Sequence, residues 1–120
     1  MICKTRAVTP EPLPQAFCPY FHRAVELIGA RWTGAIIRAL LSGVSHFSDL
    51  AAVVPGLSDR MLSERLKELE AAGIVVRDVT PSTPVRVEYQ LTEKGRALAE
   101  PIHAISAWAN DWLLEEMPAE

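Results

Sequence analysis

The stretch Pro55–Gly73, PGLSDRMLSERLKELEAAG, has the pattern of an amphipathic helix with two marked ends. Ser58 is of a type that caps helix N-termini, and Gly73 can close the far end in a left-handed conformation. Three leucines at helical spacing define one apolar face, formed by Leu62, Leu66 and Leu69. The opposite face is polar. The stretch therefore predicts a helix whose apolar face packs against a core and whose polar face is free to contact solvent or another molecule.

The segments on either side of this helix predict a winged helix. Residues 45–56, SHFSDLAAVVPG, form a short helical pattern that Pro55 and Gly56 end, so two helices follow each other through a tight turn. Residues 85–91, VRVEYQL, then alternate between apolar and polar, as a half-buried strand does. Residues 74–80, IVVRDVT, are the expected partner strand, with PSTP as the loop between them. The fold class is mostly α with a small β-hairpin wing.

Further helices are expected at both ends of the chain. One begins near Pro19 and ends at Gly29, and a second, over about residues 31–42, is expected to bury Trp32. Thr92 can cap a C-terminal helix, in which Pro101 predicts a kink or a division into two helices. We expect a flexible arm over 1–17, a winged helix-turn-helix DNA-binding core over 18–92 and a C-terminal dimerisation helix over 93–120.

Composition favours a globular protein of the cytoplasm. The 120 residues are 49% hydrophobic and 22% charged, which suits one folded domain. The sequence has no apolar run long enough for a membrane span, and residues 1–19 lack the apolar centre of a signal peptide. Two cysteines, Cys3 and Cys18, are too few for a disulfide framework and suggest reduced thiols.

Charge is distributed unevenly along the chain. The formal net charge is −3, but all 12 Lys and Arg precede residue 100, whereas residues 100–120 carry five acids and no base. A chain with separated charges can place one surface against phosphates and keep its acidic end elsewhere. The distribution therefore permits DNA binding without requiring it.

Five blocks of the sequence occur in the order, and with the gaps, of one known family. They are CPYFHRAVELIGARWTGAIIRALLSG (18–43), HFSDL (46–50), PGLSDRMLSERLKELEAAGIV (55–75), PVRVEYQLTEKG (84–95) and WANDW (108–112). In these blocks the chain resembles the HxlR family of bacterial winged-helix transcriptional regulators. The resemblance implies a cytoplasmic homodimer that binds double-stranded promoter DNA and represses or activates a nearby gene. His46 departs from the family, in which an arginine is common at this position.

The polar face of the 58–70 helix and the wing supply the predicted DNA contacts. Arg60 has the best claim to read bases, because an arginine can donate two hydrogen bonds to one guanine. The alternative is a solvated face with an Arg60–Glu64 pair, and Arg65 is expected beside the core. The predicted DNA-binding residues are Ser58, Asp59, Arg60, Ser63, Lys67 and Arg86.

A two-fold dimer is expected because the C-terminal helix carries more apolar surface than so small a domain can cover. The predicted interface residues are Phe21, Val25, Ile28, Ile105, Trp108 and Trp112. Cys18, at a helix N-terminus where the dipole lowers the pKa of a thiol, is a candidate redox sensor, as the resemblance also implies. Its oxidation can join subunits or change the spacing of the recognition helices. The alternative, a small residue packed at the dimer edge, stays open.

Other classes of function have less support in the sequence. No phosphate-binding loop and no nucleophile with a partner base appears, so we expect neither an enzyme nor a cofactor. Cys18 and His22 share a helix face, but no further ligand has a zinc-like spacing, and no metal site is predicted. The main rival is a winged helix that binds another protein instead of DNA. A small-molecule or oxidant effector is compatible with either function.

Overall fold

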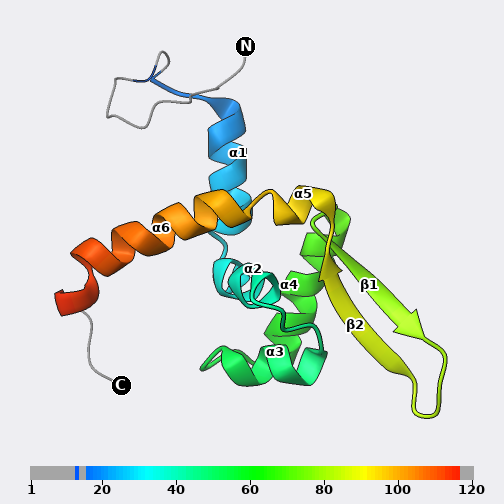
Figure 1. The fold of residues 1–120 in the computed structure, drawn as a ribbon. Coiled ribbons are helices and arrows are strands. Elements are labelled where there is room, and N and C mark those ends of the chain that lie inside the picture. The colour runs from blue at the N-terminus through cyan, green and yellow to red at the C-terminus, as the bar shows by residue number, and fades with distance from the viewer. Residues whose placement is uncertain (1–12, 14–15, 117–120) are drawn as a thin grey trace.

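The computed structural model describes residue 13 and residues 16–116, so most of the predicted arm, with Cys3, and the last four residues lie outside it. Helices and one hairpin make up the described chain (Figure 1). The elements are α1 (Pro19–Ile28), α2 (Thr33–Leu41), α3 (Phe47–Val53), α4 (Asp59–Ala71), β1 (Val75–Thr80), β2 (Arg86–Leu91), α5 (Glu93–Arg96), α6 (Ala99–Trp112) and the 3-10 turn η1 (Leu114–Glu116). This is the predicted fold class, a helix-turn-helix followed by a two-stranded wing.

Helix α4 has the ends that the sequence predicts. The Ser58 hydroxyl accepts a hydrogen bond from the Met61 N–H at 3.1 Å. At the other end Gly73 has φ of 77°, and the Ile74 N–H donates to the Leu69 carbonyl at 2.9 Å. The Lys94 ammonium adds a hydrogen bond to the Ala72 carbonyl, one of the carbonyls left open by the last turn. Both ends of α4 are therefore held in place.

The core lies between α2, α3, α4 and the base of the hairpin. All three leucines of the predicted apolar face of α4 are buried, together with side chains from the neighbouring elements. The fully buried apolar side chains are Ile36, Ile37, Leu50, Leu62, Leu66, Leu69, Ile74 and Val75. This packing leaves the polar face of α4 directed outward, and it positions the candidate site.

The wing is a regular antiparallel hairpin that projects from the helices (Figure 1). Its register pairs Val75 with Leu91 at the base and Thr80 with Arg86 near the tip. Only the base is buried, at Val75 and Leu91. The predicted alternation holds only in part on β2: Leu91 is buried and Tyr89 half-buried, but Glu88 on the opposite face is half-buried too. Val85 lies before the strand and is exposed.

Helix α2 begins later than predicted because Trp32 leaves the helical conformation. Its φ is 78°, so the first helical residue is Thr33. The Trp32 side chain is half-buried rather than fully buried and packs against the core. Its ring also lies against Gly56, where an added Cβ would be 3.2 Å from the Trp32 Cη2 atom. The left-handed turn at Trp32 thus places the indole over the turn between α3 and α4.

The C-terminal region forms two helices, one of the two outcomes predicted from Pro101. The division comes earlier than Pro101, however: Thr92 caps the short α5, and α6 begins only after Leu98. Pro101 lies in the first turn of α6, where the backbone N–H groups have no partner within the helix, so the proline removes no helical hydrogen bond. The first such bond is donated by the next residue, from the Ile102 N–H to the Leu98 carbonyl at 3.0 Å.

Candidate nucleic-acid interface

The N-terminal half of α4 presents a polar, exposed surface. Ser58, Asp59 and Arg60 are exposed at the start of the helix, Ser63 is half-buried one turn later, and Lys67 is exposed after a further turn. Ser58 is already engaged, because its hydroxyl caps the helix. Four of the six predicted DNA-binding residues thus lie on α4, and a fifth, Ser58, caps it; none of the five is among the buried residues of the helix.

Arg60 is exposed and forms the pair that the alternative interpretation predicts. Its Nε atom lies 3.2 Å from Glu64 Oε2, and its side chain is 89% exposed. An exposed pair between residues four apart in a helix contributes only about 0.3–0.5 kcal/mol. This contact is weak enough for the guanidinium to exchange it for a partner in a duplex groove.

Arg65 has a structural position, as the sequence predicts. Its Nε donates to the Arg31 carbonyl at 2.9 Å, and its Nη1 bonds the Glu68 carboxylate at 2.9 Å. The Arg65 side chain is 17% exposed. Arg65 therefore ties α4 to the segment between α1 and α2, and it is not available to reach a separate molecule.

Arg86 begins β2 beside the loop at the tip of the wing and is exposed. It faces Thr80 across the hairpin, on the same side as Asp78 and Glu88, which are also paired with each other. Directly opposed carboxylates repel one another. The described wing therefore has mixed charge, with Arg86 as the cation nearest its tip.

His46 links the middle of the wing to the start of α3, a contact that sequence reasoning missed. Its Nε2 lies 3.3 Å from Glu88 Oε2, and its Nδ1 lies 3.8 Å from Asp49 Oδ2. Beside it, the Tyr89 N–H donates to the Ser45 carbonyl at 2.8 Å. His46 and Glu88 are 42 residues apart in the sequence, so no local pattern predicts their contact.

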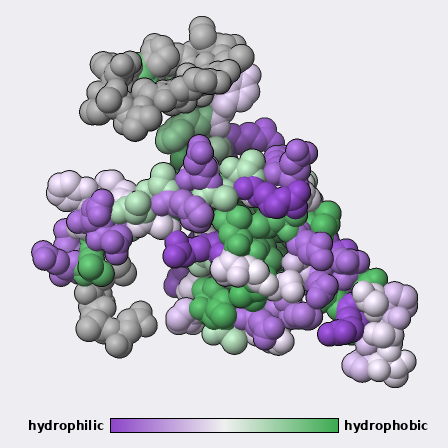
Figure 2. All heavy atoms as spheres, viewed as in Figure 1, coloured by the Kyte–Doolittle hydropathy of each residue, from purple (hydrophilic) through white to green (hydrophobic). Residues whose placement is uncertain are grey.

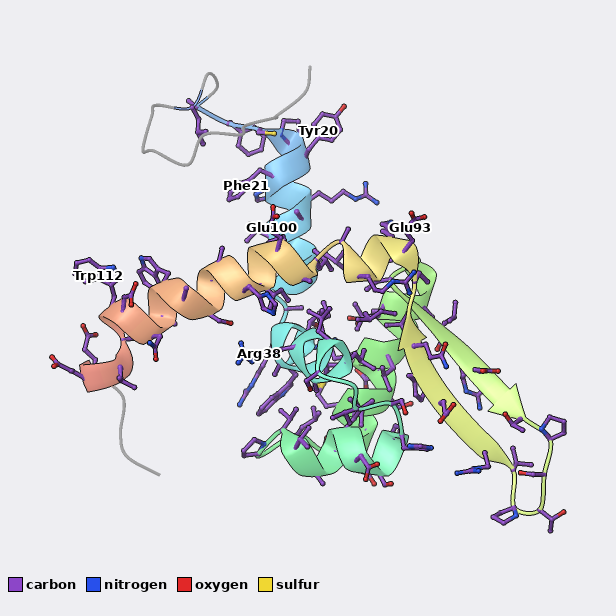
Figure 3. The ribbon with its side chains drawn as sticks, in the orientation of Figure 1. Tyr20, Phe21, Arg38, Glu93, Glu100 and Trp112 are labelled. Carbon is purple, nitrogen blue, oxygen red and sulfur yellow. The ribbon has the colours of Figure 1, made fainter. Side chains whose placement is uncertain are left out.

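Helices α1 and α6 leave a set of large apolar side chains exposed. In Figure 3, Phe21 on α1 and Trp112 on α6 both lie on the side where the two helices diverge. Of the predicted interface residues, Ile28 instead packs against the chain's own core. The exposed members of the set are Phe21, Val25, Ile105, Trp108 and Trp112.

Cys18 caps α1 from the N-terminal side. Its sulfur accepts a hydrogen bond from the Phe21 N–H at 3.4 Å, and the residue is half-buried. In the structure Cys18 is disulfide-bonded, so the expectation of a reduced thiol is wrong for this residue here.

The described residues offer neither a membrane span nor a metal cluster. None of their helices combines the length and the apolar character that a membrane crossing requires. Within the same part of the chain, no three His, Cys, Asp or Glu side chains gather to hold a metal ion.

A family model described as HxlR-like helix-turn-helix matches residues 27–117. The chain belongs to this family. The match covers every element from the end of α1 to η1, including the helix-turn-helix, the wing and α6. Its curated relatives are HTH-type transcriptional regulators, so this chain is a regulator of that class and not an enzyme.

Two of the relatives illustrate the similarity, both of them from Bacillus subtilis. The uncharacterised HTH-type transcriptional regulator YvaP is 53% identical over 96 residues, which is 80% of this chain and 89% of YvaP. The HTH-type transcriptional regulator YodB is 46% identical over 95 residues, which is 79% of this chain and 85% of YodB.

Solved structures of two regulators have the same fold. The reduced form of YodB matches with a TM-score of 0.72 and 44% identity, over 82% of this chain and 97% of that one. Diamide-treated YodB matches with a TM-score of 0.69 and 45% identity, over the same shares. The redox regulator HypR in its reduced form matches with a TM-score of 0.73 and 34% identity, over 82% of this chain and 99% of that one.

Proposed function

We propose that this regulator binds double-stranded promoter DNA as a homodimer, with α4 in the major groove and the wing beside it. The observation that carries the proposal is the division of α4 into a buried leucine face and an exposed polar face, directly before a projecting hairpin. In helix-turn-helix proteins the N-terminal residues of the second helix meet the base edges. Here these are Ser58, Asp59 and Arg60, with Ser63 and Lys67 farther along and Arg86 on the wing.

Arg60→Ala is expected to weaken operator binding by about 1–3 kcal/mol and to relax base preference at one position in each half-site. The reason is the loss of two donors that match guanine O6 and N7. The measurement is a gel shift on intergenic DNA beside the gene, with substitutions through the site. Arg23→Ala is the matched control, because it removes an exposed arginine from α1 and leaves α4 intact. Unchanged affinity and base preference would remove Arg60 from the interface.

The same assay separates DNA binding from the rival function. Contacts from Lys and Arg release counterions, so the logarithm of the binding constant should fall linearly as the logarithm of salt concentration rises. Helix α4 with its cap holds four acids against three bases, which is the feature that favours a protein partner over DNA. A folded dimer that shifts no DNA even at low salt would support that rival.

The homodimer is proposed from the exposed apolar side chains of α1 and α6. Trp108 is 56% exposed and Trp112 is 68% exposed, both on one helix. Contiguous apolar surface of this kind marks interaction sites, and a two-fold axis lets the same patch cover itself. The dimer also pairs two recognition helices, which lets two half-sites contribute to affinity. We also place the protein in the cytoplasm, where the promoter DNA of a bacterium lies.

We further propose that the regulator responds to thiol oxidants through Cys18. Two thiols lose two electrons and two protons to form the disulfide, and an oxidant such as diamide takes both up as it becomes a hydrazine. Cys18 is disulfide-bonded in the present structure, which is the oxidised end of this exchange. Two relatives support the same assignment, since HypR is described as a redox regulator and a structure of diamide-treated YodB has been solved.

Cys18→Ser is expected to keep operator binding and to abolish its change on diamide treatment. Serine retains a capping oxygen for α1, so the helix should form without the reactive sulfur. Gel shifts of both proteins, reduced and diamide-treated, measure the response. Non-reducing electrophoresis shows whether the disulfide joins two subunits. A full diamide response in the serine variant would show that Cys18 is only a packing residue.

A further inference from the structure

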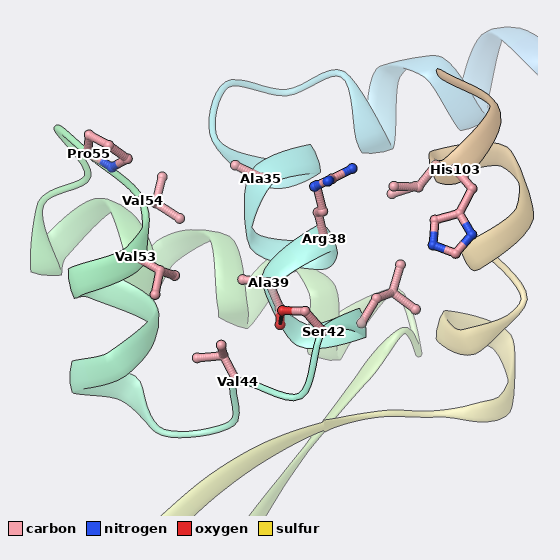
Figure 4. A pocket seen from close by; sticks show the side chains of 11 residues that line it. Ala35, Arg38, Ala39, Ser42, Val44, Val53, Val54, Pro55 and His103 are labelled. Atoms are coloured by element: carbon pink, nitrogen blue, oxygen red, sulfur yellow. Dashed lines mark hydrogen bonds between the residues drawn. The ribbon is translucent and has the colours of Figure 1, made fainter. Parts of the chain in front are cut away.

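A pocket of about 500 Å³ lies between α2, the end of α3 and α6 (Figure 4). This volume is within the range of roughly 300–1,000 Å³ that is usual for small-molecule sites. Figure 2 shows hydrophobic surface over α2 and α3 in this region. The apolar side chains that line the pocket are Ala35, Ala39, Leu41, Val44, Val53, Val54, Pro55 and Ile102.

Two basic side chains stand on one side of this apolar lining. Figure 4 shows Arg38, from α2, and His103, from α6, across the pocket from Val53, Val54 and Pro55. Arg38 is held in position by a hydrogen bond from its Nη1 to the Ser106 hydroxyl on α6. A guanidinium has five N–H donors in a planar fork, so most of its donors remain for another acceptor.

The pocket supplies no counter-charge of its own. Its lining contains neither Asp nor Glu, and the third polar side chain is Ser42. Within the described chain, none of the ion pairs includes Arg38 or His103. A cation beside an apolar surface, with no carboxylate near it, is complementary to a ligand with one anionic end and an apolar body.

We propose that this pocket binds an aromatic monocarboxylate as an effector. Arg38 receives the carboxylate, His103 donates a further hydrogen bond to it, and the ring system lies against Val44, Val53 and Val54. Because Ser106 already orients the guanidinium, the binding site is preorganised and little side-chain entropy is lost on binding.

The position of the pocket gives such a ligand a route to the DNA-reading helix, and this step rests on the proposed function. Val53, Val54 and Pro55 lead into the turn before α4, whereas Ile102 and His103 lie on α6, which carries the proposed dimer contacts. A ligand that contacts both the turn before α4 and the start of α6 can favour one spacing of the two recognition helices in the dimer over another. Operator affinity changes only to the extent that the ligand binds the two arrangements differently.

Binding can be tested on the full chain without DNA, so that its failure is separate from a failure of DNA binding. Isothermal titration calorimetry measures the dissociation constants of 2-naphthoate and of 2-naphthamide, which has the same ring system without the charge. The difference between the two constants shows how much binding depends on the carboxylate. Arg38→Gln is expected to weaken naphthoate binding at least tenfold, Arg38→Lys to weaken it less, and Ala35→Leu to block it by filling the pocket. Arg23→Gln is the matched control and should bind as the parent protein does.

The histidine signals in a proton NMR spectrum locate the ligand. The His103 ring resonance should move on addition of naphthoate, and those of His22 and His46 should stay in place, each being assigned by a His→Gln variant. Circular dichroism confirms that each variant is folded. No saturable binding at millimolar naphthoate, equal binding of naphthamide, or equal binding by folded Arg38→Gln would each overturn the proposal.

Discussion

Replacing Trp108 and Trp112 together by alanine is expected to turn the proposed dimer into monomers. Both indoles lie on the exposed face of α6, at a spacing of four residues, with Ile105 one turn earlier. A buried interface tryptophan typically contributes about 2 kcal/mol or more, so two of them account for about 4 kcal/mol, which is roughly a thousandfold in the dimer dissociation constant. Gel filtration with light scattering measures the change directly.

Operator binding is expected to weaken with the dimer, because a monomer engages one half-site at a time. Tyr20→Ala is the matched control: it removes a large exposed aromatic side chain from α1, on the side away from Phe21 (Figure 3). The control should remain dimeric and keep its affinity for DNA. If the double tryptophan variant is still a dimer at low micromolar concentration, the interface lies on another surface.

The local features of the fold were predictable from the sequence, because short-range rules determine them. Residue type alone predicts Ser58 and Gly73 as the ends of α4, and the structure confirms both. The wing followed from alternation over seven residues. These features depend on neighbours within one helical turn or one strand, which is the range over which a sequence pattern carries information.

The features that the sequence did not reveal depend on contacts between distant segments. The left-handed conformation of Trp32 places its ring against Gly56, and His46 reaches Glu88 on the wing. The pocket brings Arg38 beside His103, two residues that no motif connects. At the candidate site, the sequence identified Arg60 but left its Glu64 pair as an alternative, and this pair is present in the free protein.

Gly95→Ala is expected to destabilise the fold by about 2–3 kcal/mol, a cost typical of an extra methyl group forced into a packed interior. A Cβ at this position would lie 2.3 Å from the Ile74 carbonyl oxygen and 2.9 Å from Leu91 Cδ2. The first contact is with backbone, which cannot rotate aside, so α5 must move away from the base of the wing. Thermal unfolding followed by circular dichroism should show a Tm lower by roughly 10 °C.

Gly34→Ala is the matched control for this change. Gly34 lies inside α2, and a Cβ there meets only the Ile28 carbonyl oxygen, at 3.5 Å. Because alanine is favoured over glycine in a helix by up to about 1 kcal/mol, the control should be as stable as the parent protein or more stable. Both substitutions add one methyl group, so a difference between their Tm values reports how little space surrounds Gly95. Equal Tm values would mean that α5 does not pack against the strand bases as closely as the structure places it, and the attachment of the wing to the C-terminal helices would need a different explanation.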